Sequence, residues 1–230
     1  MKQIAVGKIR AHLTGQSVEA LTLSRVYRDS FDGDAESVLR SIDAIGYSQE
    51  YFLMNIGDVK GVVIDDAMRR VAPKVVVELG GYIGYSAVRI ARMLRSGGHL
   101  YSIEADPMNA AIAASIVERA GMSSRVTIIV GKSNEVLPTL KERYNIQAID
   151  LLFIDHWKSL YLPDIKLVEE LGLLRDGSEV LADNVIFPGT PDYLAYIRSH
   201  PKFTSTYNKL SLEYTPEIED GVEVSVYHAN

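Results

Sequence analysis

Four successive side chains, an aspartate, a histidine, a tryptophan and a lysine, follow an apolar run at Asp155 to Lys158. A carboxylate can bind a divalent cation, and a lysine beside such a cation has a lowered pKa, which suits Lys158 to take a proton from a hydroxyl group. The structural alternatives are an ion pair between Lys158 and Asp164, and simple packing of His156 and Trp157. This stretch is the first candidate for catalytic chemistry.

A second acid and an amide, Asp183 and Asn184, come directly after a later apolar run. Parallel strands end at the same edge of a sheet, so neighbouring strands would bring these two residues close to Asp155. Two carboxylates and an amide are hard oxygen ligands and predict Mg²⁺, and Mn²⁺ or Ca²⁺ would use the same oxygens. The five histidines are scattered and show no zinc spacing. The alternative for each acid alone is to cap the following helix.

The elements that must position these side chains alternate in type from Lys74 onward. Apolar runs predict buried strands at residues 74–79, 99–104, 125–130, 148–154 and 178–183. Helical periodicity occupies residues 84–96, 107–121, 134–144 and 161–174, and a closing pair of strands is expected at 203–214 and 222–229. This order predicts an α/β fold, a Rossmann-like, doubly wound, mostly parallel seven-stranded sheet with helices on both faces.

The first part of the chain is different. Residues 1–72 show helical periodicity and no convincing strand, most clearly at 34–52 and 58–72. They are expected to form an N-terminal helical layer on an α/β core of residues 73–230. Because no repeat, low-complexity tract or linker divides the chain, we expect a single domain of residues 1–230.

A glycine loop at residues 80–84 follows the first predicted strand. Glycines there let the backbone approach a ligand closely and open a helix N-terminus. The loop is not the G-x-G-x-x-G pattern of dinucleotide folds, because Tyr82 and Tyr85 stand where glycines would be needed. Glu104 ends the second strand, where an acid can accept hydrogen bonds from ribose hydroxyls. Loop and acid together predict an adenosine-containing cofactor; the alternatives are a plain turn and a solvated acid.

Composition narrows the range of partners. The chain has 230 residues, a formal net charge of −6 and no Lys/Arg cluster, which argues against nucleic acid and favours a small ligand. The lack of cysteine excludes disulfides, thiolate metal sites and a cysteine nucleophile. The N-terminus has no apolar signal core, and no apolar run reaches the ~18–20 residues of a membrane span. We therefore expect a soluble, cytoplasmic monomer with no membrane partner.

Five segments resemble the Mg²⁺-dependent catechol O-methyltransferases. They occur in family order between about Ala35 and Tyr227 and read "MNIGDVKG", "VVVELGGYIGYSAVRIAR", "FIDHWKSLYLPD", "LLRDGSEVLADNVIFPGTPDYLAYIR" and "SLEY". The resemblance implies a class I methyltransferase with S-adenosylmethionine as cofactor, Mg²⁺ as metal and a catechol as methyl acceptor.

Individual roles also follow from this resemblance. It implies that Asp155, Asp183 and Asn184 hold Mg²⁺, that Lys158 is the general base and that Glu213 holds the second hydroxyl. The residues implied around the cofactor are Met54, Asn55, Ile56, Glu78, Gly80, Tyr82, Ser86, Glu104, Ala105, Ser133, Asn134, Asp155, His156 and Trp157. Those implied around the substrate are Phe52, Met54, Asp155, Lys158, Asn184, Pro188, Leu212 and Glu213. Met54 and its neighbours are expected to form a mobile lid.

Departures from the family pattern concern the walls of the site. Phe52 stands where animal members have a tryptophan, and this difference affects the choice of the hydroxyl that is methylated. Ala105 and Asn134 replace larger residues near the adenine. The absence of cysteine differs from the animal enzymes and fits a microbial, reconstructed or engineered member. Three other hypotheses stay open: a methyltransferase for larger phenylpropanoid or flavonoid catechols, a nucleotide-dependent oxidoreductase, and a cofactor-binding protein without activity.

Overall fold

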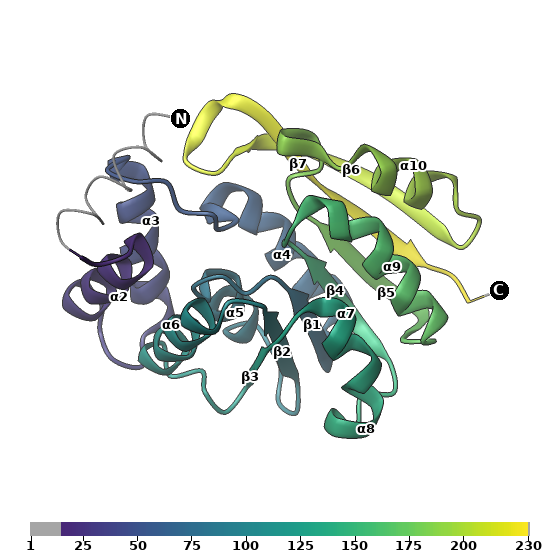
Figure 1. The fold of residues 1–230 in the computed structure, drawn as a ribbon, viewed down its shortest axis with the longest axis horizontal. Coiled ribbons are helices and arrows are strands. Elements are labelled where there is room, and N and C mark those ends of the chain that lie inside the picture. The colour runs from purple at the N-terminus through teal and green to yellow at the C-terminus, as the bar shows by residue number, and fades with distance from the viewer. Residues whose placement is uncertain (1–14, 230) are drawn as a thin grey trace.

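The computed structural model describes residues 15–229, in which seven strands form one sheet in the order β3-β2-β1-β4-β5-β7-β6 (Figure 1). The strands are β1 (Val75–Leu79), β2 (His99–Glu104), β3 (Val126–Val130), β4 (Ile149–Ile154), β5 (Leu174–Ala182), β6 (Phe203–Leu212) and β7 (Thr215–Tyr227). The α-helices are α2 (Val18–Asp29), α3 (Ala35–Ser48), α4 (Gly57–Val71), α5 (Tyr85–Ala91), α6 (Pro107–Arg119), α7 (Ser133–Val136), α8 (Leu140–Tyr144), α9 (Tyr161–Glu170) and α10 (Pro191–Ser199). Short helical turns are η1 (Leu137–Thr139), η2 (Lys158–Leu160) and η3 (Val185–Gly189).

The first five strands in the chain pair with one another in parallel, and β7 runs antiparallel to both β5 and β6. Helices cover both faces, and β6 and β7 form the closing pair at one side of the sheet (Figure 1). The predicted fold class, a Rossmann-like and mostly parallel seven-stranded sheet, is therefore confirmed.

Two apolar cores lie on opposite faces of the sheet, and β4 divides its side chains between them. Leu151 and Phe153 pack in the core shared with α2 to α6, whereas Leu152 and Ile154 pack in the core shared with α7 to α10. All six residues of β4 are buried, because a parallel strand with helices on both faces has no solvent-facing side. This explains why the strand appears in the sequence as an apolar run, with Asp150 near its start as the one charged residue.

The predicted N-terminal helical layer consists, within the described residues, of α2, α3 and α4. Their apolar side chains, such as Val26, Ile42 and Ile64, belong to the same core as α5 and α6. Residues 1–14 of the predicted layer lie outside the described part of the chain. Within residues 15–229, no helix combines the length and apolar character that crossing a membrane requires.

Several element bounds differ from the prediction. β5 begins at Leu174 and β7 at Thr215, earlier than expected, because their first residues are mostly exposed and polar and carry no apolar pattern. The helix predicted at 134–144 is divided into α7, η1 and α8 around Pro138, which cannot donate a backbone hydrogen bond.

The strand ends define the edge at which the site lies. Leu79 pairs with Ile154, and Ile154 pairs with Ala182, so β1, β4 and β5 end side by side. The backbone pairing continues for one more residue, because the amide of Asp155 donates to Leu79 (2.9 Å) and the amide of Asp183 donates to Ile154 (3.0 Å). The register thus brings the two predicted carboxylate ligands to adjacent strand ends.

Candidate active site

Lys158 lies at the centre of the polar groups beyond β4 and β5. Its Nζ atom is 3.1 Å from Oδ1 of Asp155, 3.0 Å from Oδ1 of Asn184 and 2.6 Å from the hydroxyl of Tyr161. The hydroxyl of Tyr161 in turn donates to the backbone oxygen of Asp183 at 3.0 Å. One ammonium group therefore contacts oxygens of two predicted metal ligands, and a buried phenol fixes its position.

Lys158 does form an ion pair with a nearby acid, but that acid is Asp155 (3.1 Å) and not Asp164. Oδ2 of Asp164 is instead 2.6 Å from Nε2 of His156, and the His156 ring stacks on that of Tyr161. His156 is thus held by an acid on α9, whereas Trp157, 79% exposed, does not pack in the core. Lys158 is left to the cluster around Asp155.

The oxygens of Asp155, Asp183 and Asn184 fit the ligand set of a hard divalent cation. Asp183 is 1% exposed, and its Oδ1 atom has no hydrogen-bond partner among the described residues. An orphaned buried carboxylate oxygen is costly unless a cation or donor satisfies it. Within residues 15–229 no group of three or more His, Cys, Asp or Glu side chains has metal-site geometry; the predicted set differs because its third ligand is an amide.

A buried lysine on α4, Lys60, connects this cluster to two more acids. Its Nζ atom lies 2.9 Å from Asp183, 2.9 Å from Glu213 and 2.8 Å from Asp220, and its side chain is fully buried. Although burial opposes the charge, these carboxylates raise the pKa of Lys60. It is therefore a permanent cation beneath the candidate metal centre.

Sequence reasoning missed both Lys60 and Asp220. A signal for Lys60 was present, because it lies four residues from both Ile56 and Ile64 and so shares the buried face of α4. A lysine on an apolar helix face needs an acidic partner, and the sequence alone does not say which acid.

Burial disfavours the ionised form of two acids in the cluster. Burial raises the pKa of Asp155 to about 8, against the opposing charge of Lys158 and with the like charge of Asp183 adding to the effect. Burial also raises the pKa of Glu213, although Lys60 opposes it. A further cation bound beside these carboxylates would favour their ionised forms.

The glycine loop passes against the residues that follow β4. Gly80 has φ +97°, and a Cβ atom there would collide with the backbone oxygen of Asp155. Glu104 at the end of β2 accepts the amide N–H of Tyr82 and that of Asp106, each at 2.8 Å and each with a different oxygen. Every carboxylate oxygen has a second lone pair, so Glu104 still has capacity to accept ligand hydroxyls.

Two further predicted cofactor residues carry polar atoms suited to a ligand. The hydroxyl of Ser133 and Nδ1 of His156 are buried and have no hydrogen-bond partner within the described chain. Glu78 is fully buried and accepts the hydroxyl of Ser102, and burial raises its pKa to about 7, while Ser102 and Ser86 act in the opposite direction. Ser133 and His156 follow β3 and β4, and Glu78 is the fourth residue of β1, so these groups lie toward the same edge of the sheet.

Exposed apolar side chains follow the same strand ends. Trp157, Met108 and Val130 are 79%, 65% and 56% exposed and come after β4, β2 and at the end of β3. Ala105 and Asn134 are also exposed at this edge. Exposed large apolar groups at a ligand-binding sheet edge suit a planar ring such as a nucleobase.

The predicted substrate residues lie on three segments around the cluster. Phe52 and Met54 precede α4, Pro188 follows β5, Leu212 ends β6, and Glu213 lies in the turn after it. Their environments differ: Leu212 is buried, Phe52 is half-buried, and Met54 and Pro188 are exposed. In the segment just before α4, Asn55 and Ile56 are buried. Gly57 lies against Glu213, because a Cβ on Gly57 would be 3.1 Å from that of Glu213.

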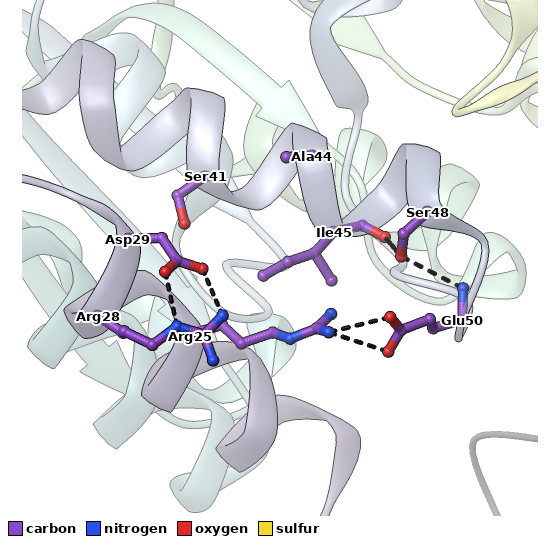
Figure 2. A pocket seen from close by; sticks show the side chains of 8 residues that line it. All are labelled: Arg25, Arg28, Asp29, Ser41, Ala44, Ile45, Ser48 and Glu50. Atoms are coloured by element: carbon purple, nitrogen blue, oxygen red, sulfur yellow. Dashed lines mark hydrogen bonds and ion pairs between the residues drawn. The ribbon is translucent and has the colours of Figure 1, made fainter.

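A separate hollow of about 220 Å³ lies between α2 and α3 (Figure 2). Its charged lining residues are already paired, Arg25 with Glu50 at 3.0 Å and Arg28 with Asp29 at 2.6 Å. None of the predicted site residues lines it. This hollow is therefore distinct from the cluster at the strand ends.

The fold is similar to that of solved O-methyltransferase structures. The structure is similar to an O-methyltransferase from Bacillus cereus in complex with SAH, with a TM-score of 0.68, 22% identity and 98% of each chain covered. It is also similar to the O-methyltransferase TomG from Streptomyces achromogenes in complex with SAM, with a TM-score of 0.69, 21% identity and 100% of each chain covered.

The chain belongs to the O-methyltransferase family, whose sequence model matches residues 29–196. It is 44% identical to catechol O-methyltransferase of Bos taurus over 95% of this chain and 80% of that protein, and 45% identical to that of Mus musculus over 94% and 80%. It is 35% identical to the transmembrane O-methyltransferase of Homo sapiens over 99% and 78%. The predicted family is confirmed, and the oxidoreductase hypothesis is wrong.

Proposed function

We propose that the protein is a catechol O-methyltransferase, which transfers the methyl group of S-adenosylmethionine to one hydroxyl of a Mg²⁺-chelated catechol with Lys158 as general base. The observation that carries the proposal is the position of the Lys158 ammonium, which contacts oxygens of both Asp155 and Asn184. The curated relatives at 44–45% identity support the reaction and the acceptor.

Asp155, Asp183 and Asn184 would hold the metal. When bound, Mg²⁺ would supply positive charge that favours ionisation of a chelated hydroxyl. A free phenol has a pKa of ~10, so little of it is ionised at neutral pH without such help. Glu213, held by Lys60, would accept a hydrogen bond from the hydroxyl that does not react.

Lys158, in its neutral amine form, would take the proton of the reacting hydroxyl at Nζ. Tyr161 and Asn184 both accept hydrogen bonds from Nζ and so hold it at the mouth of the cluster. The reacting oxygen would then be a phenolate, and bound S-adenosylmethionine would supply the methyl group that it accepts, which would leave the donor sulfur as a neutral thioether. No covalent enzyme intermediate is needed, and alignment of the two reactants contributes up to ~7–11 kcal/mol in well-oriented systems.

The methyl donor would lie along the strand ends β1 to β4. Glu104 would accept its ribose hydroxyls, Ser133, His156 and Trp157 would surround the adenine, and Ala105 and Asn134 would lie beside it. Gly80, Tyr82 and Ser86, with Glu78 behind them, would line the methionine end. Met54, Asn55 and Ile56 would lie near the transferred methyl group, and Phe52, Pro188 and Leu212 would form the apolar wall of the catechol pocket.

The chain would act as one methyltransferase domain and as a monomer. A core shared by α2 to α6 and one face of the sheet supports a single unit. Size-exclusion chromatography with light scattering would measure the mass in solution, for which we expect 25.5 kDa.

The decisive experiment measures methyl transfer from S-adenosylmethionine to a simple dihydroxybenzoate, with Mg²⁺ and with EDTA. We expect monomethylated product only with the metal. Cofactor binding without product on any catechol would overturn the acceptor assignment, and product in EDTA would overturn the metal role. Faster turnover of phenylpropanoid or flavonoid catechols in the same assay would favour the larger-substrate hypothesis.

A further inference from the structure

Asp220, near the middle of β7, is fully buried and accepts four hydrogen bonds. Its Oδ2 atom accepts from Nζ of Lys60 and from Nδ2 of Asn184, both at 2.8 Å. Its Oδ1 atom accepts from the backbone N–H groups of Ile186 (3.3 Å) and Phe187 (3.0 Å). A carboxylate is the one side chain that offers only acceptors to four donors, so this site specifies an acid.

The contact with Asn184 determines which end of an amide faces the candidate metal centre. An asparagine side chain has one oxygen and one nitrogen, and only the oxygen can bind a cation. Nδ2 of Asn184 donates to Asp220, while Oδ1 accepts from Lys158 at 3.0 Å. Reversing the amide would place a donor against the ammonium and an oxygen against the carboxylate, so only the observed orientation satisfies both neighbours.

The backbone of this segment adds to the same effect. Asn184 has φ +54°, a left-handed conformation that asparagine tolerates, and it begins the turn η3. Asp220 accepts hydrogen bonds from two N–H groups of that turn, those of Ile186 and Phe187. One side chain thus fixes both the path of the chain after Asn184 and the rotation of its amide.

We propose that Asp220 is a positioning residue for metal binding, which keeps the amide oxygen of Asn184 directed toward the cation. This inference rests on the proposed function, because it assumes that Asn184 is a metal ligand. Residues that orient a metal ligand through a hydrogen bond typically contribute about 10–100-fold to metal affinity. Asp220 contacts the proposed ligand Asn184 directly and the proposed ligand Asp183 only through Lys60, so a cycle with Asn184 separates the two routes.

The test is a double-mutant cycle on Mn²⁺ affinity, measured by electron paramagnetic resonance without substrate. We expect D220N to bind Mn²⁺ about 10–100-fold more weakly than the wild type. We expect N184A to bind weakly as well, and D220N/N184A to bind no more weakly than N184A alone, because the orientation of an absent amide has no effect. Equal affinity of wild type and D220N, or fully additive losses, would overturn the proposal.

The matched control is D150N. Asp150 is also buried and accepts two backbone N–H groups and an arginine, but it lies at the opposite end of β4. D150N should lower the temperature of unfolding and leave Mn²⁺ affinity unchanged. A wild type that binds no Mn²⁺ would overturn the metal role in the proposed function and this inference with it, whereas failure of the cycle alone would overturn only the inference.

A measurement on the wild type does not depend on D220N folding. In a ¹⁵N-labelled protein, with the signal assigned by its loss in N184A, the side-chain amide protons of Asn184 should exchange with solvent far more slowly than those of the exposed Asn145. Exchange at the rate of Asn145 would show that the amide is not held by Asp220 and would overturn the proposal.

Discussion

The Nζ atom of Lys158 lies 3.1 Å from Oδ1 of Asp155, so the candidate base and a candidate metal ligand, three residues apart in the chain, form an ion pair. The same ammonium contacts Asn184 at 3.0 Å. The Lys158 ammonium thus occupies oxygens that are expected to bind a divalent metal ion. A divalent ion bound through these same two oxygens would release Lys158 from Asp155 and Asn184.

The first prediction concerns the base. Lys158→Ala should lower turnover by about 10²–10⁴-fold, the usual contribution of a general base, with little change in S-adenosylmethionine affinity. Single-turnover methyl transfer and calorimetry measure the two quantities. Lys166→Ala, which removes an exposed lysine from α9, is the matched control and should keep full activity. Near-normal turnover of Lys158→Ala would contradict the assignment.

The second prediction concerns the metal ligand Asp183. Asp183→Asn keeps the size of the side chain but replaces the carboxylate beside Lys60, so Mg²⁺-dependent catechol affinity should fall by more than about 10-fold. Calorimetric titration of catechol in the presence of S-adenosylhomocysteine, with and without Mg²⁺, measures it. The exposed Asp192→Asn should behave like the wild type. Unchanged affinity in Asp183→Asn would exclude Asp183 as a ligand.

The third prediction concerns pH and Asp43 on α3. Burial raises the pKa of Asp43 from 3.8 to about 6, although the hydroxyls of Tyr214 and Tyr85 oppose the rise. Between these values the folded chain holds a proton that the unfolded chain has released, so the free energy of unfolding falls as the pH rises from about 4 to 6.

Denaturant unfolding measured across this pH range tests the prediction. Asp43→Asn should reduce the fall by up to about 3 kcal/mol, the value that corresponds to the shifted pKa. Asp192→Asn serves as the exposed control. The same pH dependence in Asp43→Asn and in the wild type would show that another group is responsible.

The fourth prediction separates backbone conformation from steric collision in the glycine loop. Gly80 and Gly97 both have positive φ, +97° and +81°, but only at Gly80 would a Cβ meet the backbone of Asp155. Gly97→Ala should cost about 1 kcal/mol of stability. Gly80→Ala should cost more and should also weaken S-adenosylmethionine binding. Equal effects of the two substitutions on unfolding and on cofactor affinity would remove the argument for a close approach at Gly80.

The amino-acid sequence by itself determined the sheet and the edge at which the site lies. β4 is apolar from Leu151 to Ile154 because both its faces are covered, and Asp155 and Lys158 follow soon after. One stretch of sequence therefore predicts both the strand and the chemistry at its end. The parallel order then predicts that Asp183 ends beside Asp155, as the register shows. These features depend on local pattern and on the regular geometry of parallel sheets.

Only the tertiary structure decided which charges meet beneath the site. Lys60 comes from α4, Glu213 from the end of β6 and Asp220 from β7, separated by up to 160 positions in the chain. No periodicity links residues so far apart, because their contact depends on how α4 packs against the antiparallel pair β6 and β7. The buried face of α4 indicates that Lys60 needs acidic partners, but the choice of partners is made by packing, since a buried charge is stable only beside the carboxylates that the fold brings to it.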